Sequence, residues 1–155
     1  MNVRPATRED TAAIGQIAEA TELFPASLLP GMIETALAGG DDVWLVAEGA
    51  GRITGFIFAS PEEITDRTWN ILAIGVHPDG QGQGAGRALL VAAEAMLGSA
   101  RLIVIETSQL PGQAAARGLY QSAGYSEEGT VRDFYEDGVD KVIFRKALPG
   151  SDNGT

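Results

Sequence analysis

The chain has 155 residues, 45% of them hydrophobic, and a formal net charge of −10; such an acidic surface disfavours nucleic acid and anionic membranes, and it either favours cationic partners or serves solubility alone. It has no cysteine and one histidine, His77, which excludes disulfides, a thiolate nucleophile and a metal site built from cysteine or several histidines. With no membrane-length apolar run and no signal-peptide pattern, we expect a cytoplasmic single domain over residues 1–148, followed by a flexible tail over 149–155.

Apolar periodicity and turn residues predict seven strands and four helices in the order β-α-α-β-β-β-α-β-α-β-β. The strands are expected at residues 2–5, 42–48, 52–60, 69–76, 102–105, 125–135 and 139–147. The helices are expected at residues 7–21, 26–38, 86–97 and 113–122. Thr7, with Asp10 three residues on, has the pattern of a capped helix start. The order predicts a mixed α/β sheet rather than a series of β-α units.

The middle of the chain predicts a parallel pair of strands joined through a helix. The helix at 86–97 is apolar almost all round, so we expect it to be buried on more than one side. Residues 102–105 (L-I-V-I) form a continuous apolar run, typical of a strand covered on both faces. With the strand at 69–76 these elements make a right-handed β-α-β unit.

A glycine-rich loop lies between that first strand and the helix, with glycines at every second position from 80 to 86. The first amides of a helix have no internal partners and carry partial positive charge, so the loop predicts a pyrophosphate-bearing ligand. A Walker-type loop is excluded because Arg87-Ala88 follows Gly86 in place of Lys-Ser/Thr. A dinucleotide fingerprint fits only weakly, because His77-Pro78-Asp79 separates the loop from its strand. A surface turn without a ligand is the remaining alternative.

Two motifs resemble those of the GCN5-related N-acetyltransferase (GNAT) family. Residues 81–86 (Q-G-Q-G-A-G) look like the family's Q/R-x-x-G-x-G/A pyrophosphate loop. Residues 113–125 (Q-A-A-A-R-G-L-Y-Q-S-A-G-Y) are similar to its N-x-x-A-x-x-L-Y-x-x-x-G-F motif, with Gln113 in place of Asn and Tyr125 in place of Phe. The motifs cover residues 68–125, and the order of elements extends the resemblance to nearly the whole chain.

The resemblance implies the acyl-CoA N-acyltransferase fold: a mixed, mostly antiparallel sheet with a central parallel, splayed strand pair flanked by helices. It also implies acetyl transfer from acetyl-CoA, without a metal, to a primary amine of a small molecule or peptide. Gly75 suits a disruption of the sheet at the splay. The residues expected to bind the cofactor are Ile74, Gly75, Val76, Gln81, Gly82, Gln83, Gly84, Ala85, Gly86, Arg87, Gln113 and Tyr120.

The implied chemistry needs a proton donor for the departing thiolate. Tyr120 is the candidate general acid, since a phenol can protonate a thiolate. Glu106, at the end of a strand beside the cleft, is the candidate general base, directly or through water, although an amine that enters deprotonated needs no base. His77 is expected to be structural. The residues expected to contact the acceptor are Phe24, Trp69, Asn70 and Tyr135.

Two other functions stay open at this stage. A non-catalytic acyl-CoA-binding sensor would use the same loop without turnover. A nucleotide-binding oxidoreductase fragment would bind NAD(H) and ignore CoA. Edge strands could also pair between chains, so a homodimer is possible.

Overall fold

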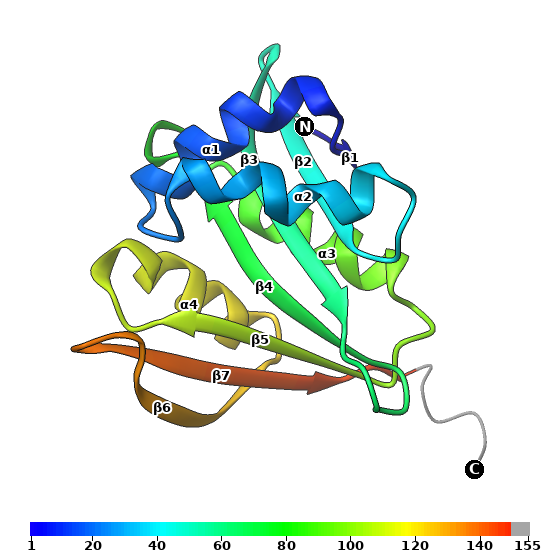
Figure 1. The fold of residues 1–155 in the computed structure, drawn as a ribbon, viewed down its shortest axis with the longest axis vertical. Coiled ribbons are helices and arrows are strands. Elements are labelled where there is room, and N and C mark those ends of the chain that lie inside the picture. The colour runs from blue at the N-terminus through cyan, green and yellow to red at the C-terminus, as the bar shows by residue number, and fades with distance from the viewer. Residues whose placement is uncertain (150–155) are drawn as a thin grey trace.

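The computed structural model describes residues 1–149, which form a seven-stranded sheet with four helices (Figure 1). The strands are β1 (Asn2–Pro5), β2 (Val43–Gly49), β3 (Arg52–Pro61), β4 (Thr68–Val76), β5 (Leu102–Ser108), β6 (Ser126–Glu136) and β7 (Val139–Ala147). The helices are α1 (Thr11–Ala20), α2 (Leu29–Leu37), α3 (Ala85–Met96) and α4 (Ala114–Ser122). The predicted order of elements is confirmed, and short 3-10 turns precede α1 and α2 where longer helices were expected. All but the first residue of the predicted tail lie outside the described residues.

The sheet has the strand order β1-β2-β3-β4-β5-β7-β6, and only β4 and β5 run parallel. These two strands pair from Thr68 with Leu102 to Ile71 with Ile105, and beyond that point they no longer pair with each other, although β4 stays paired with β3 and β5 with β7. They diverge toward their carboxyl ends (Figure 1). The mixed, mostly antiparallel sheet with a central splayed parallel pair is therefore confirmed. We call the point after Ile71 and Ile105 the fork.

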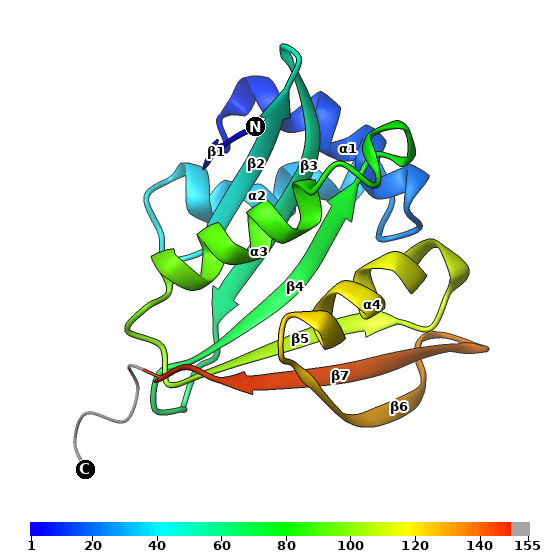
Figure 2. The same ribbon diagram turned by 180° about the vertical axis from the view of Figure 1, so that it is seen from behind.

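Helices cover both faces of the sheet. α1 and α2 lie on one face and α3 and α4 on the other (Figures 1 and 2). On α3, Leu89, Leu90 and Ala93 are buried, whereas Val91 is 61% exposed and Met96 is 54% exposed. The prediction that this helix is buried on more than one side is wrong, because the sheet and α4 cover only one of its faces.

Two glycines allow the close contacts that shape the region around the fork. A Cβ on Gly75 of β4 would lie 3.0 Å from Leu23 and 3.1 Å from Ile17, so the glycine lets α1 and the residues after it approach the strand. A Cβ on Gly86 would lie 3.0 Å from Leu119, so α3 begins in close contact with α4. Both contacts leave too little room for a side chain.

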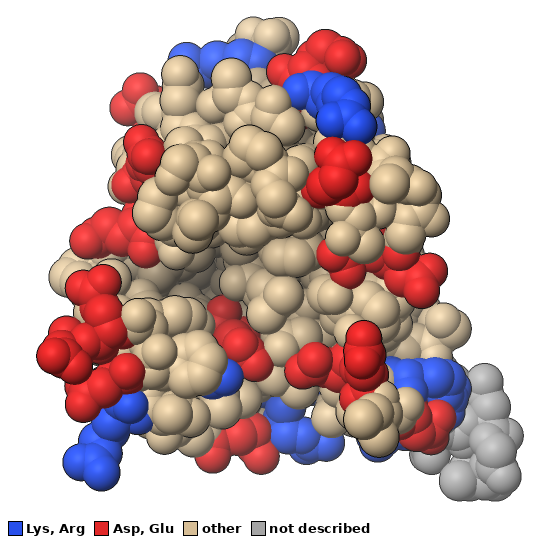
Figure 3. Space-filling view, in the orientation of Figure 1, with Lys and Arg blue, Asp and Glu red and all other residues tan. Residues whose placement is uncertain are grey.

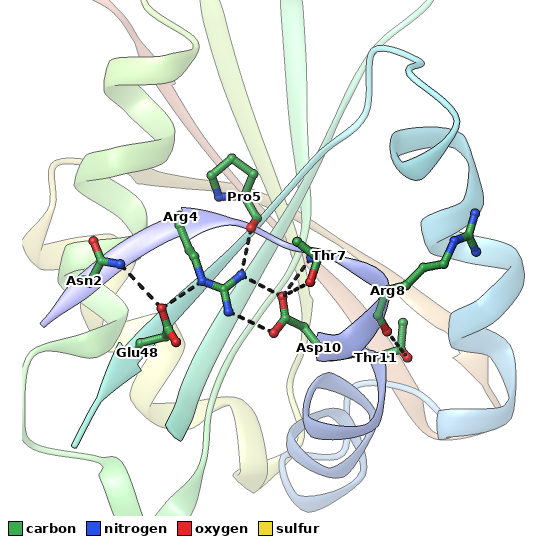
Figure 4. Close-up of polar contacts among 8 residues, drawn as sticks. All are labelled: Asn2, Arg4, Pro5, Thr7, Arg8, Asp10, Thr11 and Glu48. Atoms are coloured by element: carbon green, nitrogen blue, oxygen red, sulfur yellow. Dashed lines mark hydrogen bonds and ion pairs between the residues drawn. The ribbon is translucent and has the colours of Figure 1, made fainter. Parts of the chain in front are cut away.

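The start of α1 is fixed by a cluster of charged groups near the N-terminus (Figure 4). Arg4 of β1 donates to both oxygens of Asp10, at 2.8 and 3.0 Å, and its Nε donates to Glu48 of β2 at 2.8 Å. Asp10 also accepts the Thr7 backbone N–H at 2.8 Å, which confirms its predicted capping role. The Arg4 guanidinium holds the pKa of the buried Asp10 carboxyl below its usual range.

Candidate active site

The glycine-rich loop ends in a row of backbone amides without partners. His77 Nδ1 accepts the Asp79 N–H at 3.1 Å, which supports its predicted structural role and orders the 3-10 turn η3 (Pro78–Gly80). Gly82 and Gly84 have φ angles of 83° and 86°, a conformation that favours glycine. Within the described residues, no acceptor pairs with the backbone amides of residues 82–87. These amides are available to an anion.

A first cavity of about 320 Å³ lies between this loop, the end of β4 and α4. Ten of the twelve predicted cofactor residues line it: Ile74, Gly75, Val76, Gln81, Gly82, Gly84, Ala85, Gly86, Arg87 and Gln113. Gln83 lines a separate hollow beside Arg52, and Tyr120 lines neither. Arg87 donates to Ser122 of α4 at 2.8 Å, so its guanidinium is held at the start of α3.

Gln113 belongs to a bridge between α1 and the segment that follows β5. It is 1% exposed; its Nε2 donates to the Thr21 carbonyl, and its Oε1 accepts from Thr107 at 3.5 Å. Beside it, Glu22 accepts the Gly112 backbone N–H at 3.0 Å. The Gln113 amide is therefore engaged with the protein, and the bridge supports one wall of the first cavity.

A second cavity of about 450 Å³ lies among the residues after α1, the end of β5 and the β6–β7 hairpin. On the face that carries α1 and α2, the surface is hollowed and acidic side chains gather along one side of the hollow (Figure 3). Phe24 and Tyr135, two of the four residues expected to contact the acceptor, line this cavity together with Glu106, the candidate general base. Burial, and secondarily Glu106, raises the pKa of Tyr135 to about 12.

Glu106 is held by residues of two neighbouring strands. One carboxylate oxygen accepts from Asn70 Nδ2 at 2.8 Å, and the other lies 3.4 Å from Lys141 Nζ. The Lys141 ammonium also lies 3.8 Å from the centroid of the Phe134 ring. Asn70 is 3% exposed, and its Oδ1 has no hydrogen-bond partner among the described residues. Asn70 does not line the second cavity itself, but it holds Glu106, which does.

Tyr120 lies in the core on α4, 1% exposed, with its ring centroid 5.5 Å from that of Phe144. Its hydroxyl makes no hydrogen bond within residues 1–149, and burial raises its pKa above the usual value. The charge of an ionised Tyr135, which lines the second cavity, raises the pKa of Tyr120 by a smaller amount. Trp69 packs against the main core and lines neither cavity.

Sequence reasoning missed several residues that line the second cavity or hold its side chains in place. Lys141 comes from β7 and meets Glu106 only through strand pairing, and no local pattern marks it. Glu19, Glu22 and Glu136 line the second cavity from the end of α1 and of β6. In the sequence these three glutamates are part of the net charge of −10, and no pattern sets them apart from the other acidic residues. Over residues 1–149, no group of three or more His, Asp or Glu side chains is arranged to hold a metal ion, and no helix is long and apolar enough to cross a membrane.

The sequence matches the Acetyltransferase (GNAT) domain over residues 40–127, more than half of the chain. The chain therefore belongs to the GNAT acetyltransferase family, as its two motifs predict. No curated protein matches it significantly.

Solved structures share its fold. A GNAT-family protein from Desulfovibrio desulfuricans is 27% identical, with a TM-score of 0.81 over 94% of this chain and 98% of its own. A ribosomal-protein-alanine N-acetyltransferase from Brucella melitensis is 23% identical, with a TM-score of 0.74 over 96% and 100% of the two chains. The yncA protein from Salmonella typhimurium, solved with acetyl-CoA, is 23% identical, with a TM-score of 0.73 over 95% and 93%.

Proposed function

We propose that the protein transfers an acetyl group from acetyl-CoA to a primary amine of a small molecule or peptide by direct attack. The observation that carries this proposal is the row of free amides at residues 82–87, at one end of a cavity that extends to the part of β4 that no longer pairs with β5. A second cavity lies beyond the fork and offers a place for the amine. The acetyl-CoA complex of yncA and the acceptor class of the Brucella protein agree with the proposal.

The residues of the first cavity fit acetyl-CoA. The amides of residues 82–87 and the Arg87 guanidinium match the charge of a pyrophosphate. Beyond Ile71 the edge of β4 that faces β5 is unpaired, so backbone groups near Ile74 to Val76 are available to amide groups of a pantetheine arm. Ala116 and Leu119 supply apolar wall for the carbon chain.

When bound, acetyl-CoA supplies a thioester carbonyl that an amine attacks and a thiolate that leaves. Glu106 and Asn70 form the polar group nearest the fork on the acceptor side, where a carboxylate can accept a proton from an ammonium. A phenol is protonated at neutral pH, and burial raises the pKa of Tyr120 further, so its hydroxyl carries a proton for the leaving thiolate. Burial raises the pKa of a thiol as well as that of a phenol. Burial alone therefore does not oppose transfer of a proton from the Tyr120 phenol to the CoA thiolate.

The direct test is an assay for CoA thiol release, paired with mass spectrometry of the product, over a panel of small amines and peptides with free N-termini. The proposal predicts an acetylated amine whose formation requires both acetyl-CoA and the protein. Binding of acetyl-CoA without turnover of any amine in the panel would favour the non-catalytic sensor instead.

A further inference from the structure

The lining of the second cavity combines an apolar wall with carboxylates. Its apolar and aromatic side chains include Leu23, Phe24, Leu72, Leu110, Tyr135 and Val139. Its charged residues are Glu19, Glu22, Glu106 and Glu136, and neither lysine nor arginine is among the described residues that line it. The occupant must therefore bring positive charge together with aliphatic surface.

The inner end of this cavity is built to hold a nitrogen that carries hydrogen. Glu106 has a side chain that is 19% exposed, and it is fixed from one side by Asn70 and from the other by Lys141. Asn70 is buried and does not itself line the cavity, so it acts on the cavity only by positioning the Glu106 carboxylate. That carboxylate is the hydrogen-bond acceptor that an amine N–H meets at this end.

The outer end carries three carboxylates that have no cationic partner within residues 1–149. Glu19 and Glu22 accept backbone N–H groups from Ala26 and Gly112, and the Glu136 carboxylate makes no hydrogen bond or ion pair with the described residues. All three are exposed, whereas Glu106 is partly buried and paired with Lys141. Three of the four carboxylates thus lie at the outer end of the cavity, away from Glu106. The transfer step itself does not use them.

We infer, on the basis of the proposed function, that the acceptor is a small dication: an amine with a second ammonium group separated from the reacting nitrogen by an aliphatic segment. The reacting nitrogen lies toward Glu106. The aliphatic segment lies along Phe24 and Leu72, and the second ammonium lies among the outer carboxylates.

Three amines with a four-carbon chain test this inference: 1,4-diaminobutane, butylamine and 4-aminobutyrate. Initial rates with acetyl-CoA are expected to give a kcat/KM for the diamine on the order of tenfold above butylamine, from two or three exposed charge pairs. The zwitterion, whose carboxylate meets the outer glutamates, is expected to be the poorest acceptor. Equal kcat/KM values for the diamine and butylamine, or a peptide acceptor better than both, would overturn the inference.

A matched pair of variants locates the effect. Glu136→Gln is expected to raise KM for the diamine roughly two- to fivefold, and to raise KM for butylamine by a smaller factor. Glu127→Gln removes an equal charge from the same strand outside the cavity and is expected to change neither. An identical KM for wild type and Glu136→Gln at low salt contradicts the inference.

The failure of this inference is distinguishable from failure of the proposed function. Turnover of butylamine or a peptide without preference for the diamine overturns the inference and leaves the acetyltransferase intact. A protein whose melting temperature does not respond to acetyl-CoA overturns both.

Discussion

The side-chain amide of Asn70 donates a 2.8 Å hydrogen bond to the Glu106 carboxylate immediately beyond the last paired residues of β4 and β5. Pairing of the two strands ends at Ile71 and Ile105, and Glu106 is the next residue of β5. The contact therefore joins the two strands by side chains just where their backbones separate. It holds the Glu106 carboxylate in the lining of the second cavity.

Replacing Glu106 by glutamine tests its role on the acceptor side. Glu106→Gln keeps an acceptor for Asn70 but removes the charge, so we expect kcat/KM for the amine to fall roughly a hundredfold, the lower end for loss of a general base. The Kd of acetyl-CoA should not change, because Glu106 does not line the first cavity. Steady-state kinetics and calorimetry measure the two constants, and an unchanged kcat/KM would remove Glu106 from the mechanism.

Tyr120→Phe tests the proton donor without disturbing the fold. The Tyr120 hydroxyl has no partner within residues 1–149, so the free energy of unfolding should change by less than about 1 kcal/mol. The rate of transfer should fall roughly 10²–10⁴-fold, as for other general acids.

Tyr125→Phe is the matched control for that variant. The Tyr125 hydroxyl donates to Glu94 at 2.8 Å, so its loss should lower the free energy of unfolding by about 0.5–1.5 kcal/mol and leave turnover unchanged. Full turnover in Tyr120→Phe would exclude Tyr120 as the acid.

Gly75→Ala tests the close packing of α1 against β4. The new Cβ would lie 3.0–3.1 Å from Leu23, Ile17 and Phe56, so overpacking should cost about 1–3 kcal/mol of unfolding free energy. Gly129→Ala in β6 is the control, because its Cβ meets no atom within 4 Å. Urea denaturation of both variants measures the difference. Equal stabilities would mean that α1 can move away from the strand at no cost.

The sequence predicted the elements better than it predicted the contacts between distant ones. Turn residues and alternation located the strands, and the two motifs located the glycine loop and α4. The burial of α3 was misjudged because Val91 and Met96 are apolar yet lie on the face that neither sheet nor helix covers. Composition of a helix does not reveal how many of its faces have a neighbour.

The sequence predicted the part of the candidate site whose residues lie close together along the chain. Most residues of the glycine loop line one cavity because a single turn carries them. The contact of Lys141 with Glu106 depends on the pairing of β7 with β5, and the bridge from Thr21 to Gln113 joins residues far apart in the chain. Only the fold brings such pairs together.

The Asp10 carboxylate makes stability depend on acid pH. Its pKa is lowered by Arg4, so the folded state releases this proton more readily than the unfolded chain; the stabilisation is present above the unfolded pKa of about 4 and is lost as pH falls through the lower, folded value. Asp10→Asn should lower the free energy of unfolding by about 2 kcal/mol at pH 7. The gap from wild type should narrow below about pH 4.

Urea titrations of wild type and Asp10→Asn at several pH values measure this dependence. Glu48→Gln is the comparison on the exposed side of Arg4 and should show a smaller loss. A gap that stays constant down to pH 2 would show that the charge on Asp10 does not contribute.

The measurement that tests the first cavity most directly is a thermal melt with acetyl-CoA, CoA or NADH. At a hundredfold excess over Kd, acetyl-CoA and CoA should each stabilise the protein by about 2.7 kcal/mol, a rise in Tm of roughly 5–10 °C, while NADH has no effect. A shift with NADH alone, or no shift with either CoA compound, would contradict the assignment of the glycine loop to acetyl-CoA.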